Sequence, residues 1–105
     1  MDGRAGLPPG RPRAIETPGH TEGHVSFLLE NAGVVITGDA LASYDPLSGA
    51  EGPRILPDAL NADPGRARTS VAALERLDAG TLLFGHGDPY LGDPSRAVDQ
   101  AMERL

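Results

Sequence analysis

Hydrophobic positions in the first half of the chain form short runs that glycine, proline and polar residues interrupt. Residues 24–30 and 33–37 are rich in Val, Ile, Leu and Phe, which is typical of β-strands, and residues 14–16 predict a shorter strand before them. Only Asn31 and Ala32 separate the two longer runs, so we predict a tight hairpin in which Asn31 takes a positive φ. The third strand ends directly before a Gly-Asp pair.

The second half of the chain combines helical and extended patterns. Residues 43–62 lack clear periodicity and contain three prolines, which predicts a long loop with at most one short turn. Asp63-Pro64 predicts a helix N-cap followed by proline at the first helical position, and apolar residues at helical spacing continue towards a C-cap at Gly80. Residues 81–84 predict another strand. A terminal helix is expected from Asp93-Pro94, with one apolar face formed by Ala97, Val98, Ala101, Met102 and Leu105.

The composition fits one small ordered domain. A chain of 105 residues has room for a modest core, and its 14 Gly and 10 Pro bring it close to the level at which disorder becomes an alternative. These residues gather at turns and in residues 1–13, which we predict to be a flexible N-terminal segment. Because uninterrupted apolar runs persist between the turns, we interpret residues 14–105 as a turn-rich α/β domain.

Charge and cysteine content exclude several classes of function. The formal net charge of −6 argues against nucleic acid as a partner, since phosphate binding requires a basic surface. No apolar run is long enough to span a bilayer, and the N-terminus lacks the apolar stretch of a signal peptide, so we predict a cytoplasmic protein with no membrane partner. Because the chain has no cysteine, His, Asp or Glu must bind any metal ion.

All three histidines lie in two glycine-containing motifs, residues 17–24 (TPGHTEGH) and 85–88 (GHGD), and Asp39 follows a strand between them. Imidazole and carboxylate groups that meet at strand ends are typical of a metal site. The two histidines of the first motif could equally be structural, and Asp39 could be a turn residue or a helix N-cap. His86 between two glycines has fewer such explanations, because glycine lets the backbone pass close to a ligand.

These three motifs together resemble the C-terminal half of the metallo-β-lactamase-fold hydrolases, which include glyoxalase II-like thioesterases and lactonases. The resemblance extends from about Leu7 to the end of the chain. It implies an α/β fold (α+β in some schemes) that is half of an αβ/βα sandwich, with a mixed sheet and two helices. It also implies that His20, Asp39 and His86 are metal ligands, with Asp39 bridging two ions, and that His24 is structural or lies behind the ligands.

The resemblance further implies a cofactor and a reaction. Zinc is the expected metal, with two ions in a complete site, and iron or manganese would accept the same ligands. The implied reaction is hydrolysis of a small-molecule ester, thioester or lactone by a metal-activated hydroxide. Tyr44 and Tyr90 follow the loops of Asp39 and His86 and are candidates for lining the substrate pocket, although exposure or packing explains each more simply.

The chain differs from the family in one respect. Relatives have an H-x-H-x-D-H signature in their N-terminal half that supplies most of both metal sites, and this chain has no histidine left for one. Each metal would then have two ligands from this chain, fewer than the three of a catalytic zinc site, and one sheet face would be uncovered. Two hypotheses follow. The chain belongs to an enzyme completed by an N-terminal half or by a homodimer, or it is a truncated, non-catalytic relative that binds metal weakly or self-associates.

Overall fold

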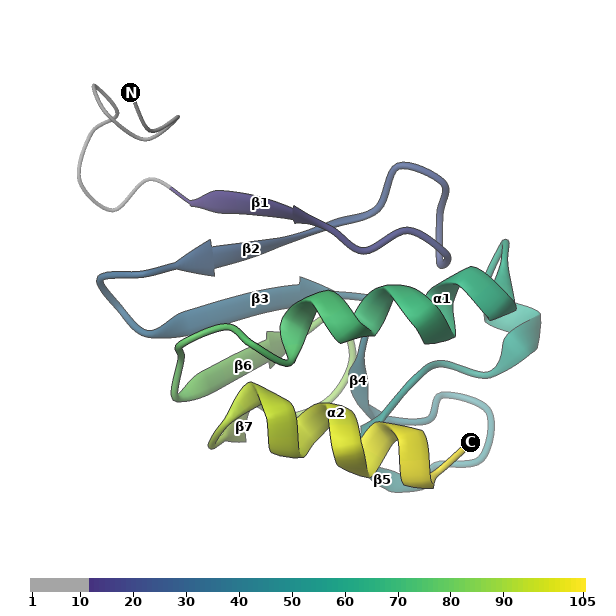
Figure 1. Ribbon diagram of the computed structural model, residues 1–105. Coiled ribbons are helices and arrows are strands. Elements are labelled where there is room, and N and C mark those ends of the chain that lie inside the picture. The colour runs from purple at the N-terminus through teal and green to yellow at the C-terminus, as the bar shows by residue number, and fades with distance from the viewer. Residues whose placement is uncertain (1–11) are drawn as a thin grey trace.

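The computed structural model describes residues 12–105. The main element of the fold is a five-stranded mixed sheet (Figure 1). Its strands are β1 (Arg13–Glu16), β2 (Val25–Leu29), β3 (Val34–Gly38), β6 (Thr81–Phe84) and β7 (Tyr90–Leu91). They lie in the order β1-β2-β3-β6-β7, in which β3 and β6 are parallel and the other neighbours antiparallel. The predicted segment 1–13 lies outside the described residues except for its last two, and Arg13 already belongs to β1.

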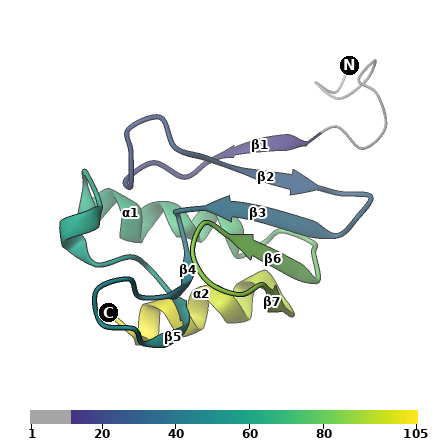
Figure 2. The same cartoon turned by 180° about the vertical axis from the view of Figure 1, so that it is seen from behind.

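Two helices cover one face of this sheet, as both views show (Figures 1 and 2). They are α1 (Pro64–Ser70), which continues into the 3₁₀ helix η2 (Val71–Leu74), and α2 (Pro94–Glu103). Both begin as predicted, because Asp63 and Asp93 accept hydrogen bonds from the first turn and proline follows each of them. Within residues 12–105, no helix has the length and apolar character needed to cross a membrane.

The hydrophobic core lies between the helices and the covered face of the sheet. The central strands contribute Leu28, Val35 and Leu82, which are at most 3% exposed. The helical segments contribute Val71, Leu74, Ala97, Val98 and Ala101. The α/β class with a mixed sheet and two helices is thus confirmed.

The opposite face of the same strands is uncovered. Phe27, Ile36 and Leu83 are register partners on β2, β3 and β6, and they are 36–37% exposed. Figure 2 shows these strands from behind with no helix in front of them. Within the described part of the chain, this apolar face therefore has no layer packed on it.

The predicted loop over residues 43–62 is wrong in one part. The segment contains a two-stranded sheet of β4 (Ala42–Tyr44) and β5 (Glu51–Arg54), followed by the 3₁₀ turn η1 (Asp58–Leu60). Pro53 lies inside β5, which is possible because a strand of a two-stranded sheet has an edge that needs no N–H donor. The strands were not predicted because prolines interrupt the hydrophobic periodicity of this segment.

Three further details differ from the predictions. The first helix ends before Gly80, whose N–H donates instead to Gly33 of the β2–β3 hairpin (2.9 Å). The positive φ of that hairpin is at Gly33 and not at Asn31, because glycine adopts it without steric cost. Met102 and Leu105, which lie in the last turn of α2 and beyond its end, are 43% and 63% exposed and outside the core.

Candidate metal centre

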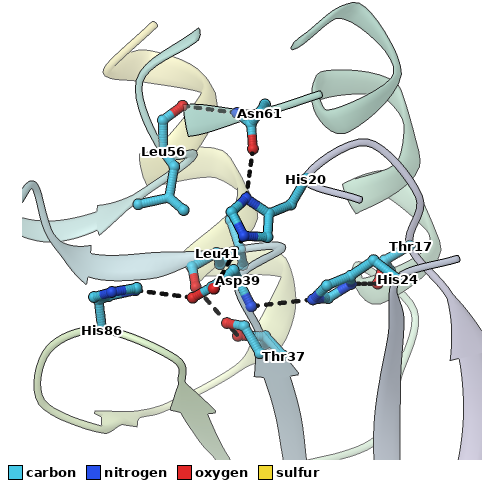
Figure 3. A network of polar contacts seen from close by, with 10 residues as sticks. Thr17, His20, His24, Thr37, Asp39, Leu41, Leu56, Asn61 and His86 are labelled. Atoms are coloured by element: carbon cyan, nitrogen blue, oxygen red, sulfur yellow. Dashed lines mark hydrogen bonds and ion pairs between the residues drawn. The ribbon is translucent and has the colours of Figure 1, made fainter. Parts of the chain in front are cut away.

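The predicted ligands lie at one edge of the sheet, where the parallel strands β3 and β6 both end (Figure 3). Asp39 follows β3 directly, His86 lies two residues beyond β6, and His20 is in the loop between β1 and β2. Loops at strand ends are common positions for functional groups, because the sheet holds them in register. The fold therefore brings together three side chains that are far apart in the sequence.

The carboxylate of Asp39 lies between the two imidazoles, and each of its oxygens faces one ring. Oδ2 is 3.1 Å from Nε2 of His20, and Oδ1 is 2.8 Å from Nδ1 of His86. The side chains of His20 and Asp39 are about a quarter exposed, whereas that of His86 is nearly half exposed. Each contact is favourable only if a proton or a metal ion lies between nitrogen and oxygen, because two lone pairs repel each other. Each of the two contacts thus requires a ring hydrogen or a metal ion between its two atoms.

His24 lies beside this cluster, with both ring nitrogens bonded to other groups of the protein (Figure 3). Nε2 accepts the backbone N–H of Asp39 (3.1 Å), so Nδ1 has the hydrogen and donates to Oγ1 of Thr17 (3.0 Å). The hydroxyl of Thr17 then donates to Ser26 (2.8 Å), which donates to the carbonyl of Thr37 (3.3 Å). In this arrangement His24 has no free lone pair to offer a metal ion.

The surroundings of His24 favour its neutral form. Burial lowers the pKa of His24 below its usual value of 6.5, and the neighbouring imidazole of His20 lowers it further. A hydrogen bond with Thr17 and the charge of Asp39 oppose this shift without reversing it. The neutral ring is also the form that can accept the N–H of Asp39, so hydrogen bonding and burial require the same state.

Two glycines of the predicted motifs let the loops approach closely. A Cβ at Gly85 would collide with Oδ1 of Asp39, so glycine leaves room for the carboxylate beside the His86 loop. Gly19 has a φ of +138°, and a Cβ there would collide with the backbone of Ala67 in α1. The pairs Gly19-His20 and Gly85-His86 therefore have a steric cause, whereas a Cβ at Gly23, before His24, would meet no atom within 4 Å.

Asn61 is a residue of this region to which the sequence analysis assigned no role. The residue is 8% exposed, and its Oδ1 lies 3.2 Å from Nδ1 of His20. Its Nδ2 donates to the carbonyl of Leu56 (3.0 Å). Because 41 positions separate Asn61 from His20, neither spacing nor periodicity could indicate this contact.

Tyr44 and Tyr90 line one hollow of about 330 Å³ next to the His86 loop. Ser43, Glu51, Gly87 and Asp88 are among its other lining residues. The hydroxyl of Tyr90 accepts a hydrogen bond from Gln100 (3.3 Å), so this ring is also tied to α2. Contact of either tyrosine with a substrate stays a prediction.

The sequence profile of the metallo-β-lactamase superfamily matches residues 2–86 of the chain. The chain belongs to this superfamily. A probable metallo-hydrolase of Bacillus subtilis (strain 168), YflN, is 33% identical over an alignment that covers 79% of this chain and 34% of YflN.

Solved structures of the superfamily have the same fold. The metallo-β-lactamase family protein TTHA1429 from Thermus thermophilus superposes with a TM-score of 0.59 at 28% identity, covering 90% of this chain and 32% of its own. TTHA1623 in a di-iron-bound form superposes with a TM-score of 0.54 at 26% identity, covering 81% of this chain and 41% of its own. The chain thus spans about a third of the length of YflN and TTHA1429.

The superfamily generally binds metal ions, and the donors of this chain fit part of such a site. Two imidazoles and a carboxylate are suitable zinc or iron ligands, and they meet in pairs at Asp39. Across residues 12–105, however, no group of three or more His, Cys, Asp or Glu has the arrangement to hold a metal ion. The pairwise distances and this finding agree if the edge supplies some of the ligands and not all of them.

Proposed function

We propose that this chain contributes His20, Asp39 and His86 as metal ligands to a metal-dependent hydrolase of the metallo-β-lactamase superfamily. The observation that supports this proposal best is the carboxylate of Asp39 between two imidazoles, with one oxygen facing each. Zinc is the metal we propose, and the di-iron form of TTHA1623 makes iron the first alternative. A cytoplasmic location belongs to the same proposal.

The proposed reaction is hydrolysis of a carbonyl compound, an ester, thioester or lactone. A bound metal would supply a Lewis acid and lower the pKa of a coordinated water. In this chain, Asp39 would offer one oxygen towards each histidine, and His24 would hold the backbone of Asp39 in place. The hollow lined by Tyr44 and Tyr90 is the proposed place for the substrate, because it lies next to the loop of His86.

The remaining ligands would come from a segment with the H-x-H-x-D-H signature, on the same protein or on another chain. The test is to mix the purified chain with such a segment from a relative, add zinc, and measure hydrolysis of a thioester and a lactone. We expect turnover in the mixture that Asp39→Asn abolishes. A mixture that forms a complex and binds zinc but hydrolyses none of the substrate classes would contradict the proposed reaction.

The second candidate is a non-catalytic, metal-binding or self-associating relative. The uncovered apolar face at Phe27, Ile36 and Leu83 favours it, because such a face is a typical contact surface. This candidate predicts no turnover by the purified chain with zinc alone or in the mixture. Turnover that depends on Asp39 would rule it out.

A further inference from the structure

Ser43 of β4 holds the loop that contains His86 through two of its own groups. This loop, which connects β6 to β7, lies beside β4 in both views (Figures 1 and 2). The N–H of Ser43 donates to the carbonyl of His86 (3.0 Å), and the hydroxyl of Ser43 donates to the carbonyl of Asp88 (2.6 Å). One residue thus fixes the peptide groups that directly follow His86 and Asp88.

The His86 loop needs such bonds because its sequence gives it little rigidity. Residues 85–89 are all exposed and lie outside the helices and strands, and two of them are glycines, which have more backbone freedom than any other residue. At the start of the loop, the N–H of Gly85 donates to the carbonyl of Gly38 (2.8 Å). The bonds from Ser43 extend this attachment past His86 to Asp88.

The contact between Ser43 and the loop also explains the second glycine of the GHGD motif. Gly87 has a φ of +92°, and a Cβ there would collide with Oγ of Ser43. Glycine at this position therefore lets the loop approach β4 closely enough for the hydroxyl to reach the carbonyl of the next residue. The motif and Ser43 are thus two parts of one attachment.

The position of the loop backbone determines where the ring of His86 lies. The side chain of His86 is 46% exposed, so packing holds the ring only in part. Its Nδ1 nevertheless lies 2.8 Å from Oδ1 of Asp39. A ring in so open a place stays at the edge of the sheet only if the backbone that bears it is held there.

We propose that Ser43 is a positioning residue whose hydroxyl orders the His86 loop before any metal ion binds. The proposal rests on the proposed function only where it concerns metal affinity, because the order of the loop is a property of the metal-free chain. A ligand that is already in place loses less conformational entropy on binding, so removal of the hydroxyl should weaken metal binding. Because the bond is exposed, its removal should hardly change the stability of the fold.

The test compares the wild type with Ser43→Ala, which removes the hydroxyl and keeps the backbone N–H, and with Ser43→Thr, which keeps a hydroxyl. Ser48→Ala is the matched control, because Ser48 is an exposed serine of the β4–β5 turn whose hydroxyl donates to Asp45 (2.9 Å). ¹⁵N relaxation of the metal-free proteins gives the backbone order parameters of residues 86–88. Zinc affinity is measured by competition with a chelator, and stability by urea denaturation.

We expect order parameters near about 0.85 at residues 86–88 of the wild type and of Ser48→Ala, as in a rigid backbone. In Ser43→Ala they should fall towards the values below about 0.6 that are typical of a flexible backbone. Zinc affinity should fall about 2- to 10-fold, which corresponds to one hydrogen bond, at the same urea midpoint as Ser48→Ala. Ser43→Thr should restore both the order of the loop and the affinity, which a general loss of structure would not allow.

Several results would overturn the proposal. Residues 86–88 that are already mobile in the wild type would do so even if Ser43→Ala fails to fold. A Ser43→Ala protein whose loop is as ordered as that of the wild type would do so as well. A third such result is a zinc affinity that Asp39→Asn lowers and Ser43→Ala leaves unchanged, and in that case the metal centre stands.

The same measurements detect a failure of the proposed function separately. If the order of the loop depends on Ser43 as expected but Asp39→Asn binds zinc as well as the wild type, the proposed metal centre is wrong. The hydroxyl of Ser43 then keeps its role in ordering the loop, because the relaxation data contain no metal.

Discussion

The two faces of the central sheet differ although the same three strands form both. On the helical face, Leu82 and its register partner Val35 are completely buried. On the other face, their chain neighbours Leu83 and Ile36 are 37% exposed. Strand alternation thus places side chains of the same type in opposite environments. The difference teaches that burial on the helical face stabilises the folded chain, whereas the apolar side chains of the other face contribute little to that stability.

The covered face also changes character along its length. Its centre is apolar, but towards the candidate metal centre it contains the buried hydroxyls of Thr17, Ser26 and Thr37. These groups bond to one another and to His24, and within residues 12–105 no buried side-chain polar atom lacks a partner. Hydrogen bonds on the covered side therefore support the strand ends that bear the candidate metal ligands.

The largest expected effect comes from truncating one residue on each face. Leu82→Ala should lower the free energy of unfolding by about 2–5 kcal/mol, because it leaves a cavity between the sheet and the helices. Leu83→Ala should lower it by less than about 1 kcal/mol, because its side chain already contacts solvent. Urea denaturation measures both. Equal losses would show that the outer face is covered in solution.

A smaller effect is expected from the polar end of the covered face. Ser26→Ala removes the acceptor of the Thr17 hydroxyl and the donor to the carbonyl of Thr37. We expect a loss of about 1–3 kcal/mol in the same denaturation experiment, because buried polar groups lose their partners. Ser95→Ala on α2, outside this network, is the control. A Ser26→Ala protein as stable as the control would mean that the hydroxyl chain is not part of the support.

The pH dependence of stability tests the neutral state of His24. Because the pKa of His24 is lower in the folded chain than its usual 6.5, the unfolded chain binds the proton more readily. The stabilisation is therefore present above pH 6.5 and is lost as the pH falls below that value. In the presence of a chelator, His24→Gln should have a flatter pH dependence between pH 5 and pH 8 than the wild type. Parallel curves for the two proteins would contradict the assignment.

The smallest effect on stability is expected on the uncovered face, where the change should appear in association instead. The double substitution Ile36→Thr with Leu83→Thr places a β-branched residue at both strand positions and removes apolar surface. We expect unfolding within about 1 kcal/mol of the wild type and a lower apparent mass in sedimentation at high concentration. A marked loss of stability with no change in mass would show that this face is part of the core.

Sequence patterns predicted those elements whose periodicity is uninterrupted. Residues 81–84 and the two Asp-Pro helix starts are confirmed, since a local rule determines each of them. The β4–β5 hairpin was missed because Pro53 lies in a strand with an open edge, and β7 because it has only two residues. Local pattern rules do not describe either case.

The residues of the candidate site likewise include some that the sequence predicted and one contact that it did not. Glycine beside each of His20, Asp39 and His86 marked these residues in the sequence, and the fold brings them to one edge. The contact of Asn61 with His20 depends on two backbone hydrogen bonds between loops that are distant in the sequence. Only the folded arrangement reveals a partner of this kind.

Zinc binding by the isolated chain tests the central claim most directly. Affinity is measured by competition with a chromophoric chelator for the wild type, for Asp39→Asn, and for Asp99→Asn on the exposed surface of α2 as the matched control. The account predicts weak binding by the wild type and the control, because the edge supplies only part of a site, and at least about a tenfold loss in Asp39→Asn. Binding that does not differ between Asp39→Asn and the wild type would contradict it.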